Sequence, residues 1–453
     1  MENIYVYIDD HWQDGVADLV RLCRQPSISA QGVGMSEMVQ LLAQVMGEYG
    51  VSTRILPVSQ GKFPVVYGEI AGESPVTLLF YDHYDVQPPE PLELWDTPPF
   101  EPALRDGRLY GRGVSDDKGH IAARLFAIDA LLDANPQLPC RVKFVIEGEE
   151  ETASENLFEF IRTHKDRLQA DACLWEFGTV DHRDVPLQYL GMRGICYVEL
   201  SVETATTDVH SGVGGSILPN AAWRLVWALA SLKGPSEQIN IAGFYDQVRP
   251  PSARDRELIR ALPEIADDYK ERFGVKGFIK GLAGGEELRT EEVFSPTCTI
   301  CGLTSGYQGP GSKTVMPARA SAKVDFRLVP DQDPTDIIRG LRAHLDAHGF
   351  GDIVITDLGA DPPARTDPDD PFIQLVARTA TDVYGMPMQL VPMVGGSGPI
   401  YPFVHDLGLP VASAGLGYPD TRAHAPNENI RLDLYLKHAR HMARILDEFA
   451  RAD

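Results

Sequence analysis

Apolar residues in the first part of the chain follow the periodicities that mark amphipathic helices and buried strands. Residues 36–50 place their apolar side chains on one helical face, and residues 118–136 form a second helical pattern that ends at a proline. Residues 76–86 begin as a continuous apolar run and then turn polar, and residues 141–151 are a second apolar run that ends in acid. Strands that alternate with helices predict a βαβ sheet covered on both faces.

The pattern changes after residue 188. Residues 189–204 and 320–329 alternate between apolar and polar positions, which predicts strands with one exposed face. Residues 220–232 and 334–349 have the period of amphipathic helices. The stretch 234–295 is rich in charge, proline and glycine, and we interpret it as an elaboration of the same domain. This part of the chain therefore predicts a smaller α/β sandwich.

A core-like pattern returns from about residue 366, with a helix over 372–385, a strand-like segment over 409–415 and a terminal helix. The simplest organisation is one α/β domain interrupted by an inserted domain. The predicted boundaries are 1–188, 189–365 and 366–453.

The composition is that of an acidic globular protein. The 453 residues carry 41 basic and 65 acidic side chains, a formal net charge of −24, which argues against nucleic acid or an anionic membrane as a partner because both attract basic surfaces. No apolar stretch is long enough for a transmembrane helix, and residues 1–15 lack the basic start and apolar core of a signal peptide. Six cysteines are too few for a disulfide scaffold. We therefore expect a cytoplasmic protein.

Two segments place histidine and carboxylate side chains at the ends of predicted elements. His83 and Asp85 share one face of an extended strand, and a carboxylate two residues from a histidine suits a partner that fixes the imidazole of a metal ligand. In GRGVSDDKG, Asp116 and Asp117 lie at the start of a helix, whose dipole favours carboxylates. A helix cap is sufficient to explain Asp117.

Acidic residues also gather after the second predicted strand, at Glu147, Glu149, Glu150 and Glu151. Carboxylates crowded beside a buried strand need protons or cations, so one can serve as an oxygen ligand and its neighbour as a general base with a raised pKa. His210 in DVHSGVGG and His424 in RAHAPNENI each have, taken alone, an ordinary interpretation as surface residues.

Taken in order, HxD, GRGxxDxKG, the EE pair, HSG and the late AHxxNE loop resemble one family of di-zinc metallopeptidases. The family contains carnosinase-type dipeptidases, glutamate carboxypeptidase, succinyl-diaminopimelate desuccinylase and acetylornithine deacetylase. The segments GLTSGYQGPGSKTVMPA and DFRLVP are most similar to the dipeptidase branch. The resemblance implies an α/β fold: a mixed/parallel-sheet zinc-exopeptidase-like catalytic domain, interrupted by an inserted α/β sandwich that forms a lid and dimerisation domain.

The resemblance also implies an activity and a role for each motif residue. The activity is hydrolysis of the amide bond of dipeptides, or of similar small peptide-like substrates with a free carboxylate. Two zinc ions per chain, with manganese or cobalt as alternatives, would be held by His83, Asp116, Glu151, Glu176 and His424. Asp116 matches the bridging ligand, and Glu176 is chosen because it follows the strand DACLW with no other acid adjacent. Glu150 matches the general base that activates a metal-bridging water, and Asp85 would orient His83.

The inserted domain matches the lid through which such enzymes dimerise, so the resemblance implies a homodimer. His210 matches a histidine that reaches the active site of the partner subunit and steadies the oxyanion. Thr314, Arg327 and Ser397 match positions that hold the substrate carboxylate, a task that suits arginine because it can form bidentate hydrogen bonds. An ordinary surface ion pair is the alternative interpretation of Arg327. Hinges near residues 189 and 365 would let the lid close on the substrate.

Three other functions are compatible with parts of the sequence. A deacylase or desuccinylase of N-acyl amino acids would use the same metal site, because it also cleaves an amide next to a carboxylate. An inactive relative that acts as a binding protein would have lost ligands, whereas every ligand position here carries a competent residue. A thiol enzyme would need the CxxC of Cys298 and Cys301, which we interpret as part of a strand because its neighbours alternate in polarity.

Overall fold

The computed structural model describes residues 1–59 and 63–451, and the chain divides into two compact units. Unit 1 comprises Met1–Gly191, Arg365–Pro392 and Pro399–Asp453, and unit 2 comprises Met192–Ala364 and Met393–Gly398. The chain crosses between the units within two short strands, β10 (Gly191–Met192) and β17 (Ala364–Arg365), and again on either side of the segment Met393–Gly398.

Unit 1 is built around a six-stranded mixed sheet with the order β1-β2-β6-β3-β7-β19. The strands are β1 (Ser52–Leu56), β2 (Val65–Ile70), β3 (Gly72–His83), β6 (Leu138–Glu147), β7 (Ala172–Trp175) and β19 (Val411–Ser413). The β6–β3, β3–β7 and β7–β19 pairs are parallel, whereas the β1–β2 and β2–β6 pairs are antiparallel. The second half of β3 and all of β7 are buried, which explains their continuous apolar runs.

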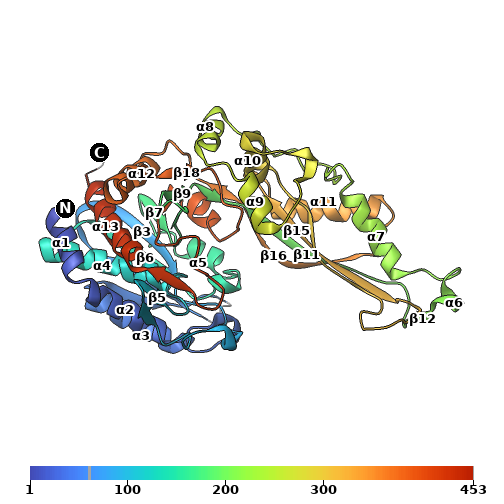
Figure 1. The fold of residues 1–453 in the computed structure, drawn as a ribbon, viewed down its shortest axis with the longest axis horizontal. Coiled ribbons are helices and arrows are strands. Elements are labelled where there is room, and N and C mark those ends of the chain that lie inside the picture. Colours follow the sequence, from blue (N-terminus) through green and yellow to red (C-terminus); the bar gives the residue numbers. More distant parts are fainter. Residues whose placement is uncertain (60–62, 452–453) are drawn as a thin grey trace. The chain divides into compact units, whose positions relative to one another are not determined.

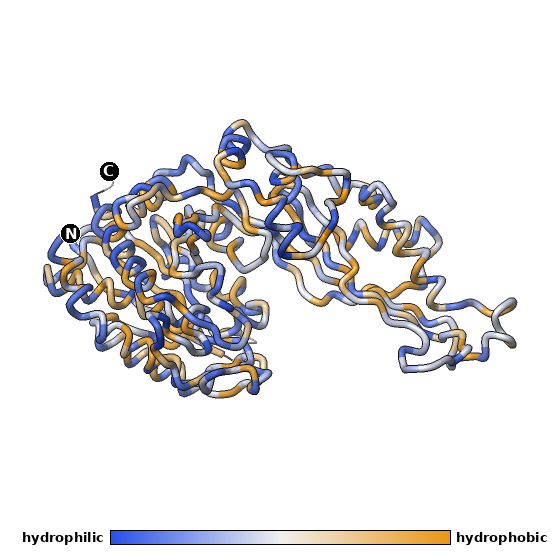
Figure 2. The backbone as a smooth tube through the Cα atoms, in the orientation of Figure 1, coloured by the Kyte–Doolittle hydropathy of each residue, from blue (hydrophilic) through white to orange (hydrophobic). Residues whose placement is uncertain are grey.

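The helices of unit 1 are α1 (Glu2–Asp10), α2 (Trp12–Arg24), α3 (Met35–Glu48), α4 (Lys118–Ala134), α5 (Leu157–Thr163), α12 (Pro371–Tyr384) and α13 (Leu432–Phe449). Helix α4 packs against α1, α2, α13 and the strands β3 and β6 (Figure 1), so it is buried along nearly its whole length. Helix α3 buries Met38, Leu42 and Val45 on the face that the sequence predicts. Hydrophobic and hydrophilic residues are interspersed along the helices of unit 1 (Figure 2), and helices such as α2 and α12, unlike α4, bury one face.

Two small sheets complete unit 1. One joins β4 (Ala103–Arg105), β5 (Arg108–Tyr110) and β20 (Asn429–Arg431), and the other joins β8 (Thr179–Val180), β9 (Pro186–Tyr189) and β18 (Gln389–Val391). The antiparallel pairing of β20 with β5 brings the loop before residue 429 beside the loop after residue 110. Two sequence segments more than three hundred residues apart therefore meet.

Two predicted strands extend further toward the C-terminus in the sequence interpretation than in the structure. β3 ends at His83 instead of residue 86, and β6 ends at Glu147 instead of residue 151. Their ladder stops at the His83–Glu147 pair, and Glu150–Thr152 forms a short 3-10 turn. The ladder therefore continues two residues beyond the apolar run of β3, through the buried residues Asp82 and His83.

Unit 2 contains a four-stranded antiparallel sheet with the order β13-β15-β11-β16. Its strands are β11 (Gly194–Glu203), β13 (Thr299–Ser305), β15 (Arg319–Leu328) and β16 (Val354–Asp361). Helices α7 (Ala221–Leu232) and α11 (Pro334–Ala347) share one apolar core with this sheet. Alternate residues of β11 are buried and half-exposed, so one face of the sheet is packed and the other is open, as predicted.

The remaining elements of unit 2 are the strands β12 (Val209–His210) and β14 (Val315–Met316) and the helices α6 (Ser211–Gly214), α8 (Ala253–Ala261), α9 (Ala266–Phe273) and α10 (Gly285–Phe294). The last three lie in the stretch 234–295 and have small apolar clusters of their own. The α/β fold class predicted from the sequence is confirmed. No helix in the described part of the chain has both the length and the apolar character needed to cross a bilayer.

Candidate metal centre

Histidine and carboxylate side chains converge at the carboxyl edge of the parallel strands in unit 1. His83 is the last residue of β3, and Glu176 directly follows β7. Asp116 and Asp117 directly precede α4, and the turn Glu150–Thr152 follows β6. Since the carboxyl ends of parallel strands meet at one edge, chain connectivity itself brings these groups together.

Asp116 lies between two pairs of side chains. Its Oδ1 is 3.0 Å from Nε2 of His83, which is in turn 3.9 Å from Oε2 of Glu176. Its Oδ2 is 2.9 Å from Nε2 of His424, which is 3.2 Å from Oε2 of Glu151. The five predicted ligands thus form one cluster, with each Asp116 oxygen directed to a different histidine. His83 and Glu176 are buried, whereas the His424 side chain is 54% exposed, so the cluster is open to solvent on one side only.

Both imidazoles of the cluster sit among carboxylates that favour their positive form. Burial opposes protonation of His83, but Asp116 and Asp85 raise its pKa well above the ordinary value. Hydrogen bonds to Asp116 and Glu151 raise the pKa of His424 to about 10. In the metal-free chain the two rings therefore supply the positive charge that this cluster of acids requires.

The pKa values of the carboxylates shift in opposite directions. Burial raises the pKa of Glu176 well above its ordinary value and that of Glu150 to about 8. Burial also acts on Asp116, but hydrogen bonds from His424 and His83 hold its pKa well below the ordinary value.

Two imidazoles and three carboxylates are a donor set that suits zinc and related divalent ions, and ligand atoms of His83, Asp116 and Glu151 lie within 4.8 Å of one another. The residues fit a metal centre.

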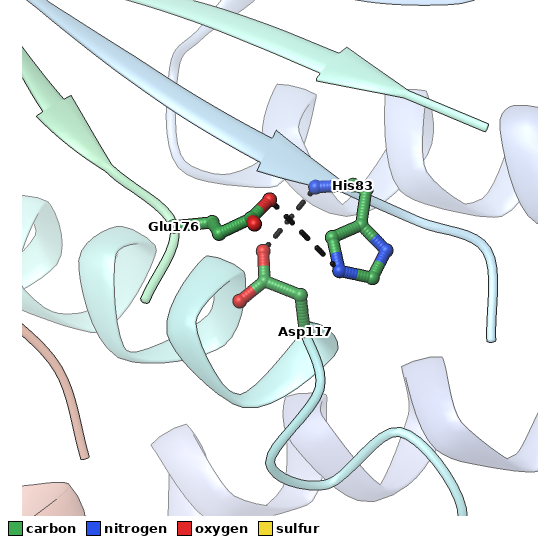
Figure 3. A group of neighbouring side chains, drawn as sticks. All are labelled: His83, Asp117 and Glu176. Atoms are coloured by element: carbon green, nitrogen blue, oxygen red, sulfur yellow. Dashed lines mark hydrogen bonds and ion pairs between the residues drawn. The ribbon is translucent and has the colours of Figure 1, made fainter. Parts of the chain in front are cut away.

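Asp117 is not the simple helix cap that the sequence suggests. It occupies the N-cap position of α4 without a side-chain capping hydrogen bond. One oxygen accepts from the backbone amide of His83 at 3.2 Å, and the other lies 2.7 Å from Nδ1 of His120. Figure 3 shows its carboxylate beside His83 and Glu176. Asp117 is close enough to be grouped with these two residues as a further ligand, but both its oxygens already have partners within the protein.

Asp85 joins the two halves of the cluster. Its Oδ1 is 3.3 Å from Nδ1 of His83, on the side of the ring opposite Asp116. Its Oδ2 accepts from the backbone amide of Glu151 at 3.1 Å. Gln87 donates to the Glu151 carboxylate at 2.8 Å. The backbone carbonyl of Asp85 lies closer to Nδ1 of His83, at 3.1 Å. Carbonyl and carboxylate partners behind a ligating histidine fix the ring and its tautomer, so Asp85 is placed for the task that the sequence assigns to it.

Glu428 is a buried residue of this site that sequence reasoning did not assign. It accepts four hydrogen bonds, from Nη1 of Arg112 at 2.7 Å and from the backbone amides of Gly113 at 3.0 Å, Ser115 at 2.9 Å and Asp116 at 3.1 Å. The loop that carries His424 is thereby tied to the loop that carries Asp116. The glutamate of the AHxxNE motif was the available signal, but its partners lie far away in sequence.

The other predicted site residues lie in unit 2 and form two pairs. His210 ends β12 next to β14, where the backbone amide of Ser211 donates to the carbonyl of Thr314 at 3.1 Å, and both His210 and Thr314 are exposed. β14 comes directly before the start of β15 in the chain. Near the C-terminal end of β15, Arg327 donates to Ser397 at 2.8 Å and pairs with Asp325 at 2.9 Å. Arg327 therefore forms the ion pair that was the alternative to a substrate-binding role, and it contacts Ser397 as well.

The fold and this cluster define a metallopeptidase, and comparison with known proteins gives the family. The chain matches the model of peptidase family M20/M25/M40 over residues 79–448 and belongs to that family. This confirms the resemblance drawn from the sequence motifs, and the chain is accordingly an enzyme of the metallopeptidase class.

Several relatives match over most of their length. The Cys-Gly metallodipeptidase dug1 of Schizosaccharomyces pombe is 27% identical over 96% of each chain. The Beta-Ala-His dipeptidase of Homo sapiens is 30% identical over 76% of this chain and 71% of that protein. Among solved structures, the M20 family metallo-carboxypeptidase Sso-CP2 from Sulfolobus solfataricus is 37% identical with a TM-score of 0.91, covering 97% of this chain and 99% of that one. Human carnosine dipeptidase 1 is 27% identical with a TM-score of 0.81, covering 100% and 99%.

Proposed function

We propose that this protein is a two-metal dipeptidase that hydrolyses the amide bond of dipeptides with a free carboxylate. The observation that carries the proposal is the position of Asp116, with one oxygen beside His83 and the other beside His424. That arrangement supports a bridging ligand between two ions. The full-length similarity to Cys-Gly and Beta-Ala-His dipeptidases supports the substrate class.

The ligands divide into two sets that share Asp116. His83 and Glu176 would complete one site, and His424 and Glu151 the other. Imidazole and carboxylate donors suit zinc, with manganese and cobalt as alternatives. Two divalent ions held there would supply charge that polarises the substrate carbonyl and lowers the pKa of the attacking water.

Glu150 is the residue best placed to move protons. It directly precedes the ligand Glu151 and opens the turn after β6. Burial raises its pKa to about 8, so a proton taken up by its carboxylate can later be released near neutral pH. Glu150 would take a proton from the attacking water and hand it to the nitrogen of the leaving amine.

The unit 2 residues support a homodimer. Arg327 and Ser397 would hold the substrate carboxylate, while Thr314 and His210 would contact the same substrate and steady the oxyanion. Arg319 and Arg327 mark the two ends of β15 and are about 26 Å apart by the rise of a strand. A dipeptide spans only about 7 Å. One substrate cannot touch both ends of β15 in one chain, so His210 and Thr314 would come from a second copy.

Helix α7 offers the second copy an apolar surface. Trp223 and Trp227 stack with ring centres 5.7 Å apart and are 56% and 55% exposed, and Val226 beside them is 40% exposed. A monomer rarely leaves such a patch uncovered. Unit 2 would thus act as dimerisation domain and lid, with hinges near residues 189 and 365, where two of the chain crossings between the units lie. All six cysteines are free thiols, which favours a reducing, cytoplasmic location.

A substrate screen tests the proposal. The purified chain is loaded with zinc, manganese or cobalt, and amine release is measured from dipeptides and from N-acetyl and N-succinyl amino acids. Dipeptides are expected to react with the higher kcat/KM. The relatives named above are dipeptidases and a carboxypeptidase, so a deacylase is not favoured. Faster turnover of N-acyl amino acids would contradict the dipeptidase assignment, and absence of hydrolysis with every metal would contradict the catalytic proposal.

A further inference from the structure

A buried arginine takes over where the ladder between β3 and β7 ends. The paired residues stop at Phe80 and Leu174. At the next position of each strand, Arg124 from α4 donates to both carbonyls, to Tyr81 at 3.0 Å through Nη1 and to Trp175 at 2.6 Å through Nη2. A guanidinium group thus replaces a direct link between the two strands.

The Arg124 side chain is fully buried and forms an ion pair. Arg124 and Asp82 are both 0% exposed, and Nη1 of the arginine lies 2.5 Å from Oδ1 of the aspartate. The guanidinium also lies 5.0 Å from the ring centre of Phe80. A buried ion pair is a poor source of net stability, because desolvation offsets the attraction. Its location therefore points to a different role from stabilising the core.

Each strand continues from its bridged carbonyl to a residue of the metal cluster. Two residues after Tyr81 comes His83, and directly after Trp175 comes Glu176. These two side chains reach within 3.9 Å of each other. The planar fork of a guanidinium holds its acceptors in a fixed geometry, so Arg124 fixes the distance between the two strand ends that present His83 and Glu176.

We propose that Arg124 is a positioning residue that sets the separation of His83 and Glu176 and thereby the affinity of one of the two metal sites. The inference rests on the proposed two-metal function. It concerns the His83–Glu176 site, because the partners of Arg124 are Tyr81 and Asp82 of β3 and Trp175 of β7, the two strands that lead to His83 and Glu176.

The test measures metal binding rather than turnover. Zinc and cobalt are titrated into the full-length metal-free protein in competition with a chelator, and the visible spectrum of the cobalt form reports ligand geometry at each site. The variants are Arg124→Lys, which keeps the charge but loses the fork, and the double variant Asp82→Asn with Arg124→Met, which leaves no unpaired buried charge. Glu176→Gln and Glu151→Gln provide reference spectra for loss of each site.

Lys143 offers a matched control. It is a buried cation of unit 1 that also donates to two backbone carbonyls, those of Arg167 at 2.7 Å and Gln169 at 2.6 Å. Its partners do not carry metal-site residues. Lys143→Met therefore measures the effect of losing a buried cationic bridge without disturbing the strand ends at the cluster.

We expect both Arg124 variants to bind one ion about 10- to 100-fold more weakly. This is the usual effect of replacing a residue that holds metal ligands in place. Their residual cobalt spectrum should match that of Glu176→Gln, while Lys143→Met keeps the wild-type spectrum. The role of Arg124 would be overturned, and the proposed function would stand, if its variants kept wild-type affinity at both sites or lost affinity equally at both. Wild-type protein that binds fewer than two ions would contradict the proposed function and this role together.

Discussion

The carboxylate of Glu428 accepts a hydrogen bond from the backbone amide of Asp116 at 3.1 Å. The first residue belongs to the loop that carries His424, and the second is the centre of the metal cluster. Glu428 itself is fully buried, and the contact is reinforced by Arg112, whose guanidinium donates to the same carboxylate. Glu428 therefore fixes the backbone of Asp116 from behind, while His424 approaches its side chain from the same loop.

Replacing Glu428 by Gln should weaken both the fold and the metal site. The oxygen Oε1 accepts from Ser115 and Asp116, and Oε2 accepts from Arg112 and Gly113. An amide has only one acceptor oxygen, so two buried donors lose their partner, each at about 1–3 kcal/mol. Urea unfolding of the metal-free protein should show a loss of about 2–6 kcal/mol, and zinc titration a weaker affinity. An unchanged unfolding midpoint would refute this role; Glu155→Gln, an exposed acid, is the control.

Replacing Glu150 by Gln should separate metal binding from turnover. Glutamine keeps the shape of the side chain but cannot accept a proton from water, so kcat should fall by about 10²- to 10⁴-fold, the usual contribution of a general acid–base. Elemental analysis should still find two ions per chain. Glu149→Gln is the matched control, because this neighbour contacts Asn156 at 2.7 Å and should keep most of the turnover. An active Glu150→Gln enzyme would exclude Glu150 as the base.

Metal loading should release protons near neutral pH. Without metal, the pKa of His424 is about 10, so its imidazole holds a proton at pH 7, and the pKa values of His83 and Glu176 are also raised well above their ordinary values. Ligands must lose their protons to bind a cation, so metal affinity should rise with pH, with about one or more protons released per chain at pH 7. Calorimetric titration in buffers of different ionisation enthalpy measures this number. Metal affinity that is constant between about pH 6 and 8 would contradict these protonation states.

Mixing two inactive variants should restore activity if the active site is shared between subunits. His210→Ala lacks the residue proposed to come from the partner, and Glu150→Gln lacks the base. A heterodimer of the two contains one site with both residues intact, so random exchange should restore about a quarter of wild-type activity. The assay follows dipeptide hydrolysis after incubating the mixed proteins, with each variant alone as the control. No recovery after demonstrated subunit exchange would place His210 in the active site of its own chain, or outside the site.

Much of the fold was predictable because the apolar pattern of each element agrees with its burial. Helices α3 and α4 and the apolar parts of β3 and β6 follow from periodicity alone. The ends of β3 and β6 were placed too far along the chain, because charged residues after an apolar run do not reveal where the partner strand stops. The order of the motifs along the chain identified the family. Several of these motifs follow strands whose carboxyl ends meet at one edge of the sheet, so their residues come together in the fold.

The sequence by itself determined the fold class, the family and the residues that gather at the carboxyl edge of the sheet, because periodicity and motif order are local properties of the chain. Only the tertiary structure decided how these residues are held. Glu428 meets Arg112, and Arg124 meets Trp175, through contacts between segments far apart in sequence, and no local pattern encodes such a pair. Asp117 likewise has the sequence of a helix cap but hydrogen-bonds to His83. The physical reason is that a buried polar group must find a partner, and which partner it finds depends on the packing of the whole domain.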